Sequence, residues 1–286
     1  MTHTILVLGA TGFAGRQVVK NLSARPGVQV KAATRFPEKY KAPAANVSPV
    51  HLVQEDFSTF APALSGVDLV FLSAVPLDMG SASKLRPFID EAKKAQVKKI
   101  VFLSAMGVEH AEASPMRQIE LHLIASGIPY NIVRPNFFME VFSESHFSNT
   151  IRHLDKILIP AADGKYSVIA ASDIAAVAAE LLLNEAHNGR ELTLTGPKAI
   201  DNHEAAAIIS SVSGKNVTYE NIPESVLVAE MLAAGASESD ARFMSFLMGA
   251  LRDGHFAPVS TAVKDITGRE PLSFEAFAEA NKTHFS

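Results

Sequence analysis

The chain has 286 residues, of which 48% are hydrophobic and 20% charged, a composition typical of a folded globular protein with a sizeable core. Its net charge of −4 is mild and no long basic cluster occurs, so nucleic acids and anionic membranes are not expected as partners. The absence of cysteine excludes disulfides, thiolate catalysis and cysteine metal sites, and it suits a reducing cytoplasm.

Up to residue 134, short apolar runs alternate with segments whose apolar residues recur at helical spacing. Continuous apolar strands that alternate with helices predict a parallel sheet buried on both faces. Their order predicts an α/β fold, a Rossmann-type doubly wound sheet. The expected strands are 5–8, 28–34, 50–53, 69–73, 100–104 and 130–134, and the expected helices are 15–24, 81–95 and 115–126.

The pattern changes after residue 136. A helix is predicted at 171–183 with Ser172 or Asp173 as its N-cap, followed by one more strand near 190–195. Asp201 and Glu204 have capping-box spacing ahead of a helix that ends at Gly214. These features predict a nucleotide-binding domain at 1–136 and a smaller, mostly helical substrate-side subdomain at 137–286, packed closely against it without a clean linker.

Neither a signal segment nor a membrane span is expected. A strand predicted from Ile5 leaves no room for a signal, and the apolar stretch IAAVAAELLL is shorter than the roughly 20 residues that a span requires. A cytoplasmic protein is therefore expected. Its oligomeric state stays open, a homo-oligomer included.

Three glycines, Gly9, Gly12 and Gly15, separate the first predicted strand from the first predicted helix. Glycine permits a tight turn and a close backbone approach, and a helix N-terminus offers free N–H groups and a positive dipole to a pyrophosphate. Glycines can also merely shorten a connection, but this placement favours a dinucleotide site. The predicted loop residues are Gly9, Thr11, Gly12, Phe13, Ala14 and Gly15.

The second predicted strand ends on Thr34 and Arg35, where a site for NAD usually has an acid. An acid would repel an adenosine 2′-phosphate, whereas a guanidinium pairs with it through charge-assisted hydrogen bonds. Thr34 adds a hydroxyl and Lys39 lies within reach of the same phosphate. A solvated surface charge is the alternative for Arg35. With the glycine loop upstream, the pattern favours NADPH (NADP⁺) as the cofactor.

Several stretches together resemble one known family: GATGFAG, FLSAMG, SGIPYNIVRPNFF, ASDIAAVAAELL and LTGP. The chain resembles the NmrA-like branch of the atypical short-chain dehydrogenase/reductases over nearly its whole length. Its nearest likeness is to the bacterial members that reduce quinones or triphenylmethane dyes. The glycine motif is common to the family, whereas RPNFF and the late LTGP are more specific to this branch.

The resemblance implies further cofactor contacts at the carboxyl ends of the strands. Asp56 and Phe57 would lie beside adenine, and the nicotinamide side would be lined by Ser73, Ala74, Val75 and Ser104. Pro135, Asn136 and Phe137 would close that end. Taken singly, each of these residues is equally explained as a turn or core residue.

Typical short-chain dehydrogenases use a Tyr-x-x-x-Lys pair, and matching through SGIPY places those two positions on Glu112 and Met116. Neither residue type performs that proton transfer. Glu120 and His110 are titratable, but a solvated helix face explains them as well. No catalytic residue is assigned, and the histidines lack metal-ligand spacing, so no metal site is predicted.

An apolar acceptor pocket is predicted from Phe138, Phe142, Phe147 and Phe246, although aromatics at helical spacing are more often core residues. The resulting hypothesis is an NADPH-dependent reductase of a quinone or similar small aromatic acceptor. Hydride transfer is the cofactor's chemistry and does not require a Tyr–Lys pair. The alternative is an NmrA-like redox sensor that binds NADP(H) and acts through a protein partner.

Overall fold

The computed structural model describes residues 2–285, apart from the side chains of residues 146 and 147. The chain forms two compact units. The first comprises residues 1–135 and 171–193, and the second comprises 136–170 and 194–286. Each unit contains two separate stretches of the sequence.

A seven-stranded sheet is the centre of the first unit, and its strand order is β3-β2-β1-β4-β5-β6-β8. The pairings from β3 through β6 are parallel, as the apolar runs predict. This confirms the predicted Rossmann-type arrangement. The strands are β1 His3–Val7, β2 Val28–Thr34, β3 Val47–His51, β4 Leu69–Ser73, β5 Lys99–Leu103, β6 Tyr130–Pro135 and β8 Glu191–Leu194.

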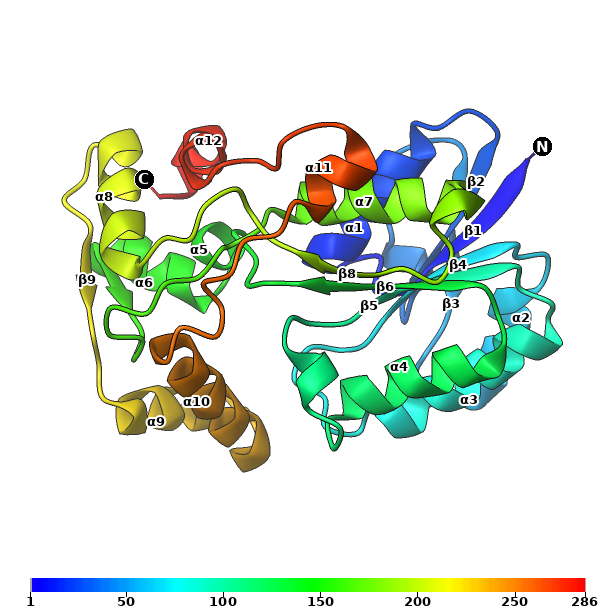
Figure 1. The fold of residues 1–286 in the computed structure, drawn as a ribbon, viewed down its shortest axis with the longest axis horizontal. Helices are drawn as coiled ribbons and strands as arrows, with labels where there is room; N and C mark the ends of the chain where they lie inside the picture. Colours follow the sequence, from blue (N-terminus) through cyan, green and yellow to red (C-terminus); the bar gives the residue numbers. More distant parts are fainter. Residues whose placement is uncertain (1, 286) are drawn as a thin grey trace. The chain divides into compact units, whose positions relative to one another are not determined.

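Helices cover both faces of this sheet: α3 and α4 lie on one face, and α1 and α7 lie on the other (Figure 1). One apolar core joins α2, α3 and α4 to the sheet through buried side chains such as Phe88, Phe102 and Leu123. The bounds of the helices are α1 Phe13–Ser23, α2 Phe60–Leu64, α3 Ser81–Lys94, α4 Pro115–Ser126 and α7 Ala171–Leu183, with short 3₁₀ turns at Pro37–Lys39, Phe57–Thr59, Val108–His110 and Glu185–His187.

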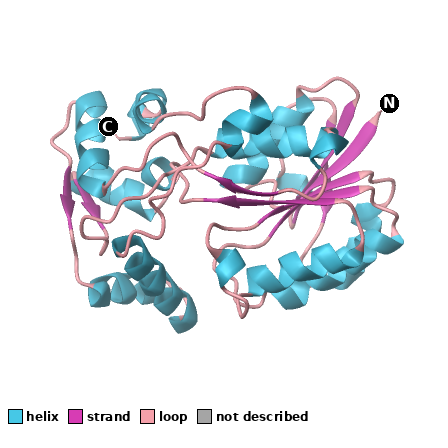
Figure 2. Ribbon diagram, in the orientation of Figure 1, coloured by secondary structure: helices cyan, strands magenta, loops and turns pink. Residues whose placement is uncertain are grey.

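The second unit is mostly helical, with one pair of short strands (Figure 2). The strands β7 Lys156–Leu158 and β9 Thr218–Glu220 pair in parallel, a feature that the sequence did not predict. The helices are α5 Val141–Glu144, α6 His146–Leu154, α8 Asn202–Ser213, α9 Glu224–Ala233, α10 Glu238–Arg252, α11 Ala262–Thr267 and α12 Phe274–Ala280, followed by a 3₁₀ turn at Lys282–His284. Within residues 2–285, no helix has both the length and the apolar character needed to cross a membrane.

The division between the units differs from the predicted boundary at 136, because residues 171–193 belong to the first unit. Helix α7 packs against α1, and β8 extends the sheet beyond β6. A single cut in the sequence therefore does not separate the two units. The reason is tertiary: the exposed edge of β6 is paired by a strand that comes more than 50 residues later.

The capping prediction for α8 is confirmed and the one for α7 is wrong. Asp201 and Glu204 form the expected capping box of α8, and Gly214 ends that helix in the left-handed conformation at φ +73°. The N-cap prediction for α7 is wrong, because the helix begins at Ala171 and places Ser172 and Asp173 inside its first turn. An acidic residue there still complements the helix dipole.

Strand β3 begins three residues earlier than the sequence predicts and contains Pro49. Pairing with β2 sets its register, with Val47 opposite Val30 and His51 opposite Thr34. Because β3 is an edge strand, the missing N–H of Pro49 costs no hydrogen bond on its free side.

The start of α1 is held against the end of β1 by a contact that only glycine allows. A Cβ at Gly15 would lie 2.0 Å from the carbonyl oxygen of Gly9, which is backbone and has no rotamer by which to move away. We expect Gly15→Ala to lower the free energy of unfolding by about 1–3 kcal/mol or more, as overpacking does. Urea denaturation followed by circular dichroism measures this loss.

Gly12→Ala is the matched control, because its Cβ would meet its nearest neighbour only at 3.4 Å and its φ of −78° suits any residue. We expect its unfolding midpoint to lie close to that of the wild type. Equal stability of Gly15→Ala and Gly12→Ala would contradict the proposed contact.

Candidate nucleotide and substrate site

The glycine loop makes the turn from β1 into α1 in the first unit. Gly9 adopts a left-handed conformation at φ +67°, and its carbonyl accepts a hydrogen bond of 2.9 Å from the N–H of Gly12. A Cβ at Gly9 would lie 2.4 Å from the Ser73 hydroxyl. Packing inside the protein therefore explains both Gly9 and Gly15, whatever the ligand.

Gly12 has no such explanation within the protein. Its φ of −78° is ordinary, and an added Cβ would make only a contact of 3.4 Å, so neither backbone strain nor packing requires a glycine. It stands at the N-cap of α1, where no side chain caps the helix and no acidic residue occupies the first turn. The unused N–H groups of such a helix start attract an anion. These residues fit a pyrophosphate.

The neighbours of Gly12 also suit an anion. Thr11 is exposed, Phe13 is half-buried and Ala14 is buried on the protein side of the helix. The Arg16 guanidinium lies 5.3 Å from the centre of the Phe13 ring and adds a positive charge to this end of α1. Arg16 is not among the loop residues predicted from the sequence, although its place in the first turn of the predicted helix is a usable signal.

Arg35 follows β2 directly and its side chain is 56% exposed. Among the described residues, no hydrogen bond is made by its guanidinium, so its donors are available. The hydroxyl oxygen of Thr34 accepts a hydrogen bond of 3.2 Å from the N–H of Phe36. The Lys39 ammonium lies 4.6 Å from the centre of the Phe36 ring. The structure thus brings Thr34, Arg35 and Lys39 to the end of one strand.

An acid from another strand end, Glu55, lies near Arg35 in space. A carboxylate oxygen of Glu55 is 3.7 Å from Nη2 of Arg35, and the other oxygen accepts a hydrogen bond of 2.9 Å from Lys84. Lys84 also donates to Asp78 at 2.8 Å. The loops after three different strands meet here, which the sequence order concealed.

Asp56 and Phe57 occupy the turn beyond β3. The Asp56 carboxylate accepts hydrogen bonds from the backbone N–H and the hydroxyl of Ser58, which lower the pKa of Asp56 and cap the 3₁₀ turn at Phe57–Thr59. Phe57 is 52% exposed, and its ring centre lies 5.3 Å from that of Phe60. Phe57 therefore presents an exposed aromatic face, whereas Asp56 is engaged in its own turn.

The residues at the ends of β4 and β5 differ in how free they are. The Ser73 hydroxyl donates to the Leu8 carbonyl at 3.0 Å and so ties β4 to β1. Ala74 is half-buried and Val75 is 39% exposed. Ser104 is buried, and its N–H donates to the Val133 carbonyl at 2.8 Å. A cofactor role for these four residues stays a prediction.

Pro135 ends β6 in the first unit, where its carbonyl accepts a hydrogen bond of 3.0 Å from Met106. Asn136 begins the second unit and is 3% exposed. Its amide donates to the Ser167 hydroxyl and to the Phe256 carbonyl, both at 2.8 Å. The Asn136 side chain is thus fully used inside its own unit, and its predicted contact with nicotinamide stays a prediction.

The predicted acceptor phenylalanines do not share one environment. Phe137 packs edge-on against Tyr166 and Phe256, and Phe138 is half-buried beside Ile169. Phe142 is only 2% exposed and lies in the core of the second unit. Its ring centre is 5.0 Å from that of Phe274.

The other two predicted acceptor residues give less support for a pocket. Phe246 on α10 is 67% exposed and stacks loosely on Phe243 at 6.3 Å. Phe147 lies outside the described side chains. An acceptor role for the phenylalanines stays a prediction.

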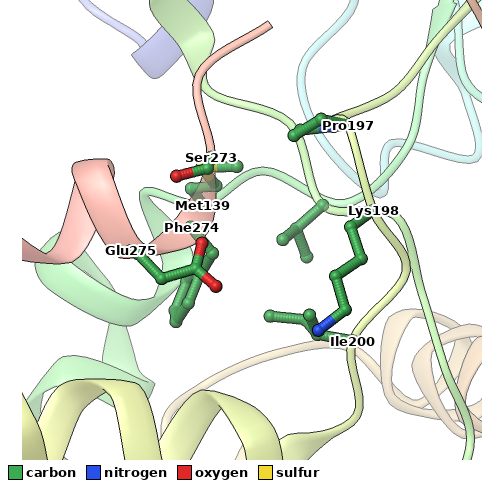
Figure 3. A pocket seen from close by; sticks show the side chains of 8 residues that line it. Met139, Pro197, Lys198, Ile200, Ser273, Phe274 and Glu275 are labelled. Carbon is green, nitrogen blue, oxygen red and sulfur yellow. The ribbon is translucent and has the colours of Figure 1, made fainter.

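A hollow with a cavity of about 20 Å³ opens in the second unit (Figure 3). Met139, Ile200 and Phe274 form its apolar lining, and Lys198 and Glu275 supply its charged groups. This space is smaller than the roughly 300–1,000 Å³ of typical ligand sites. It is therefore a poor candidate for an aromatic acceptor.

The positions predicted to correspond to a Tyr–Lys pair hold Glu112 and Met116. Glu112 is exposed in the loop before α4, and Met116 packs against the core of the first unit. His110 is exposed. Among the described residues, no group of three His, Cys, Asp or Glu side chains is arranged to hold a metal ion.

Glu120 is completely buried, so the expected solvated helix face is wrong for this residue. Arg134 binds its two carboxylate oxygens through Nε and Nη2, both at 2.8 Å, and Arg117 adds a bond of 2.7 Å. Burial acts to raise the pKa of Glu120, but the hydrogen bonds from Arg134 and Arg117 outweigh it and lower the pKa. Glu120 therefore stays ionised and is not a proton donor.

The comparisons with known proteins agree with this geometry. The model of the NmrA-like family matches residues 1–252. The chain belongs to the NmrA-like family. This confirms the resemblance that the sequence motifs predict.

Three similar proteins cover nearly all of this NmrA-like chain. It is 33% identical over 279 residues to Prestalk A differentiation protein A of Dictyostelium discoideum, with 96% of this chain and 91% of that protein covered. It is 32% identical over 290 residues to NAD(P)H azoreductase of Xenophilus azovorans, with 98% and 99% covered. The structure of the NADPH-dependent quinone oxidoreductase QOR2 of Escherichia coli, complexed with NADPH, matches with a TM-score of 0.83 at 25% identity, covering 98% and 99%.

Gly12→Val tests the glycine loop directly. The valine side chain would occupy the space that a pyrophosphate needs, while the φ of −78° allows the substitution without backbone strain. We expect native circular dichroism and loss of NADPH binding by at least about a hundredfold in calorimetry. A folded variant that binds NADPH like the wild type would remove Gly12 from the site.

Proposed function

We propose that this NAD(P)H-dependent oxidoreductase transfers hydride from NADPH to a quinone or a similar aromatic electron acceptor. The observation that carries the proposal is Gly12, a glycine that neither packing nor backbone strain requires, at the uncapped start of α1. The likeness to a quinone oxidoreductase and to an azoreductase supports the class of acceptor. Quinones and azo compounds are both conjugated electron acceptors.

The cofactor is NADPH, which supplies the hydride from its reduced nicotinamide when bound. The N–H groups at the start of α1 would hold the pyrophosphate, and Arg35 would pair with the 2′-phosphate. Thr34 and Lys39 stand close enough along the chain to add a hydroxyl and a second cation. Binding at these points fixes the adenosine half, so the reactive end is positioned by the remaining strand ends.

The acceptor's own chemistry explains why the chain needs no Tyr–Lys pair. A quinone takes up a hydride, which is one proton with two electrons, and one further proton to become a hydroquinone, while NADPH becomes NADP⁺. Water can supply the proton, because the reduced oxygens of a quinone are accessible bases. The protein then contributes mainly orientation and exclusion of competing water. A ketone, whose reduction depends on a proton donor, fits Glu112 and Met116 less well.

The second candidate is a redox sensor that binds NADP(H) and acts through a protein partner. Two observations favour it: the large exposed side chains Phe246 and Leu232 on α10 and α9, which are 67% and 44% exposed, and the likeness to a differentiation protein. A panel of quinones and azo dyes mixed with NADPH, followed by nicotinamide absorbance, separates the two. Tight NADPH binding with no acceptor reduced above background supports the sensor.

Arg35 should make the protein prefer NADPH over NADH. A charge-assisted contact contributes about 1.5–3 kcal/mol, which corresponds to a preference of about ten- to a hundredfold. We expect Arg35→Ala to remove most of this preference by weakening NADPH alone, as measured by calorimetric titration of both cofactors. A preference that persists in Arg35→Ala would remove Arg35 from the site.

If hydride transfer relies on positioning alone, substitutions at the two family positions should have small effects. We expect Glu112→Gln and Met116→Ala to lower kcat for a quinone by less than about tenfold, whereas loss of a true general acid costs about 10²–10⁴. Phe137→Leu should reduce kcat/KM more, because it shifts the chain at the predicted nicotinamide end. Stopped-flow measurement of nicotinamide absorbance gives these rates.

NADPH deuterated on one face of the nicotinamide supplies the control for chemistry. A primary isotope effect from one face only is expected if hydride transfer limits the rate. A loss of more than about a hundredfold in Glu112→Gln would instead identify Glu112 as the missing acid.

A further inference from the structure

The acid beside Arg35 comes from a different strand end and is held there by two other charges. The Oε2 atom of Glu55 lies 3.7 Å from Nη2 of Arg35, while Oε1 accepts a hydrogen bond of 2.9 Å from Lys84. Lys84 is itself fixed by Asp78 at 2.8 Å, and Asp78 accepts a further hydrogen bond of 2.8 Å from the N–H of Gly80. Glu55 is therefore positioned by the loop and helix that follow β4.

The charge state of this group is well defined. The hydrogen bond from Lys84 lowers the pKa of Glu55. The hydrogen bonds that Lys84 donates, chiefly to Asp78 and also to Glu55, raise the pKa of Lys84. Glu55 is consequently a carboxylate and Lys84 an ammonium at neutral pH. The two cations and two carboxylates of Arg35, Glu55, Lys84 and Asp78 sum to zero.

A carboxylate at this distance opposes a 2′-phosphate in two ways. It attracts the guanidinium with which the phosphate must pair, and it repels the phosphate's own charge. Ribose hydroxyls carry no charge, so an NADH ribose meets neither penalty. The Arg35–Glu55 distance of 3.7 Å is an ion pair without a hydrogen bond, which leaves the guanidinium free to turn to a ligand.

We propose that Glu55 is a specificity-determining residue of the cofactor site, which competes with the 2′-phosphate for Arg35 and limits the preference for NADPH over NADH. This inference rests on the proposed nucleotide site. Arg35 sets the direction of the preference, and Glu55 reduces its size. Lys84 moderates that reduction, because it neutralises one side of the Glu55 carboxylate.

The test is calorimetric binding of two pairs of probes to Glu55→Gln and to the wild type. One pair is NADPH and NADH, and the other is 2′,5′-ADP and 5′-AMP, which differ only in the 2′-phosphate. We expect Glu55→Gln to tighten the binding of NADPH and 2′,5′-ADP by about three- to tenfold. The affinities for NADH and 5′-AMP should change by less than about twofold. The gain should shrink in high salt, because both charges are substantially exposed.

Glu91→Gln is the matched control, since it changes the net charge equally and removes an exposed ion pair with Lys94 on the same helix as Lys84. Glu91→Gln should leave the affinities for both pairs of probes unchanged. Equal tightening of both members of a pair in Glu55→Gln, or no change in either, would overturn the role of Glu55. So would a wild type that binds 2′,5′-ADP and 5′-AMP equally.

The outcome is independent of the acceptor. If Glu55→Gln shifts the binding preference as expected while no quinone is reduced, the role of Glu55 stands and the proposed reductase activity fails. If quinones are reduced but the preference does not move, the reductase stands and Glu55 has no role in cofactor choice.

Discussion

The candidate nucleotide site depends on the close approach of α1 to the end of β1. Gly15 lies so near the Gly9 carbonyl that no side chain fits between them, and this contact fixes where the helix begins. Next to the turn at Gly9, the Ser73 hydroxyl at the end of β4 donates a hydrogen bond to the Leu8 carbonyl. The central strands and the first helix are thus locked together immediately beside Gly12. A pyrophosphate site requires a rigid helix N-terminus, because its backbone N–H donors must already point toward the anion before it binds.

Charge is arranged differently at two places in the first unit. Around Arg35 the charged side chains are partly exposed and their charges balance. Arg35 can therefore exchange Glu55 for an incoming phosphate at a small cost in free energy. Around Glu120 the ions are buried, and Arg134 binds the carboxylate in a bidentate manner while also pairing with Glu191 on β8. Removal of one partner there would leave an uncompensated buried charge. The first group is suited to ligand exchange and the second to holding α4, β6 and β8 in register.

The second unit is organised by Asn136, the first residue after the sheet. Its amide and carbonyl groups bind Ser167, Phe256 and the N–H of Phe137, so three separate segments meet at one buried side chain. Tyr166 is buried nearby and donates its hydroxyl to Asn202 at 2.6 Å, and burial raises its pKa. The phenol is thereby kept neutral and serves packing. Asn136 of the RPNFF motif therefore has a structural role, which the motif's sequence alone does not reveal.

The sequence by itself determined the fold class, the glycine loop and the family, because these follow from local periodicity and from motifs read within a few residues. It also determined the capping box of α8, whose hydrogen bonds join residues three positions apart. Only the tertiary structure decided the features that depend on distant segments. Glu55 and Lys84 reach Arg35 from later loops, Glu120 is buried by an arginine on β6, and residues 171–193 return to complete the first unit. Sequence patterns report the preferences of neighbouring residues, whereas burial and ion pairing are set by the strand order of the sheet, which brings together the ends of strands far apart in the chain.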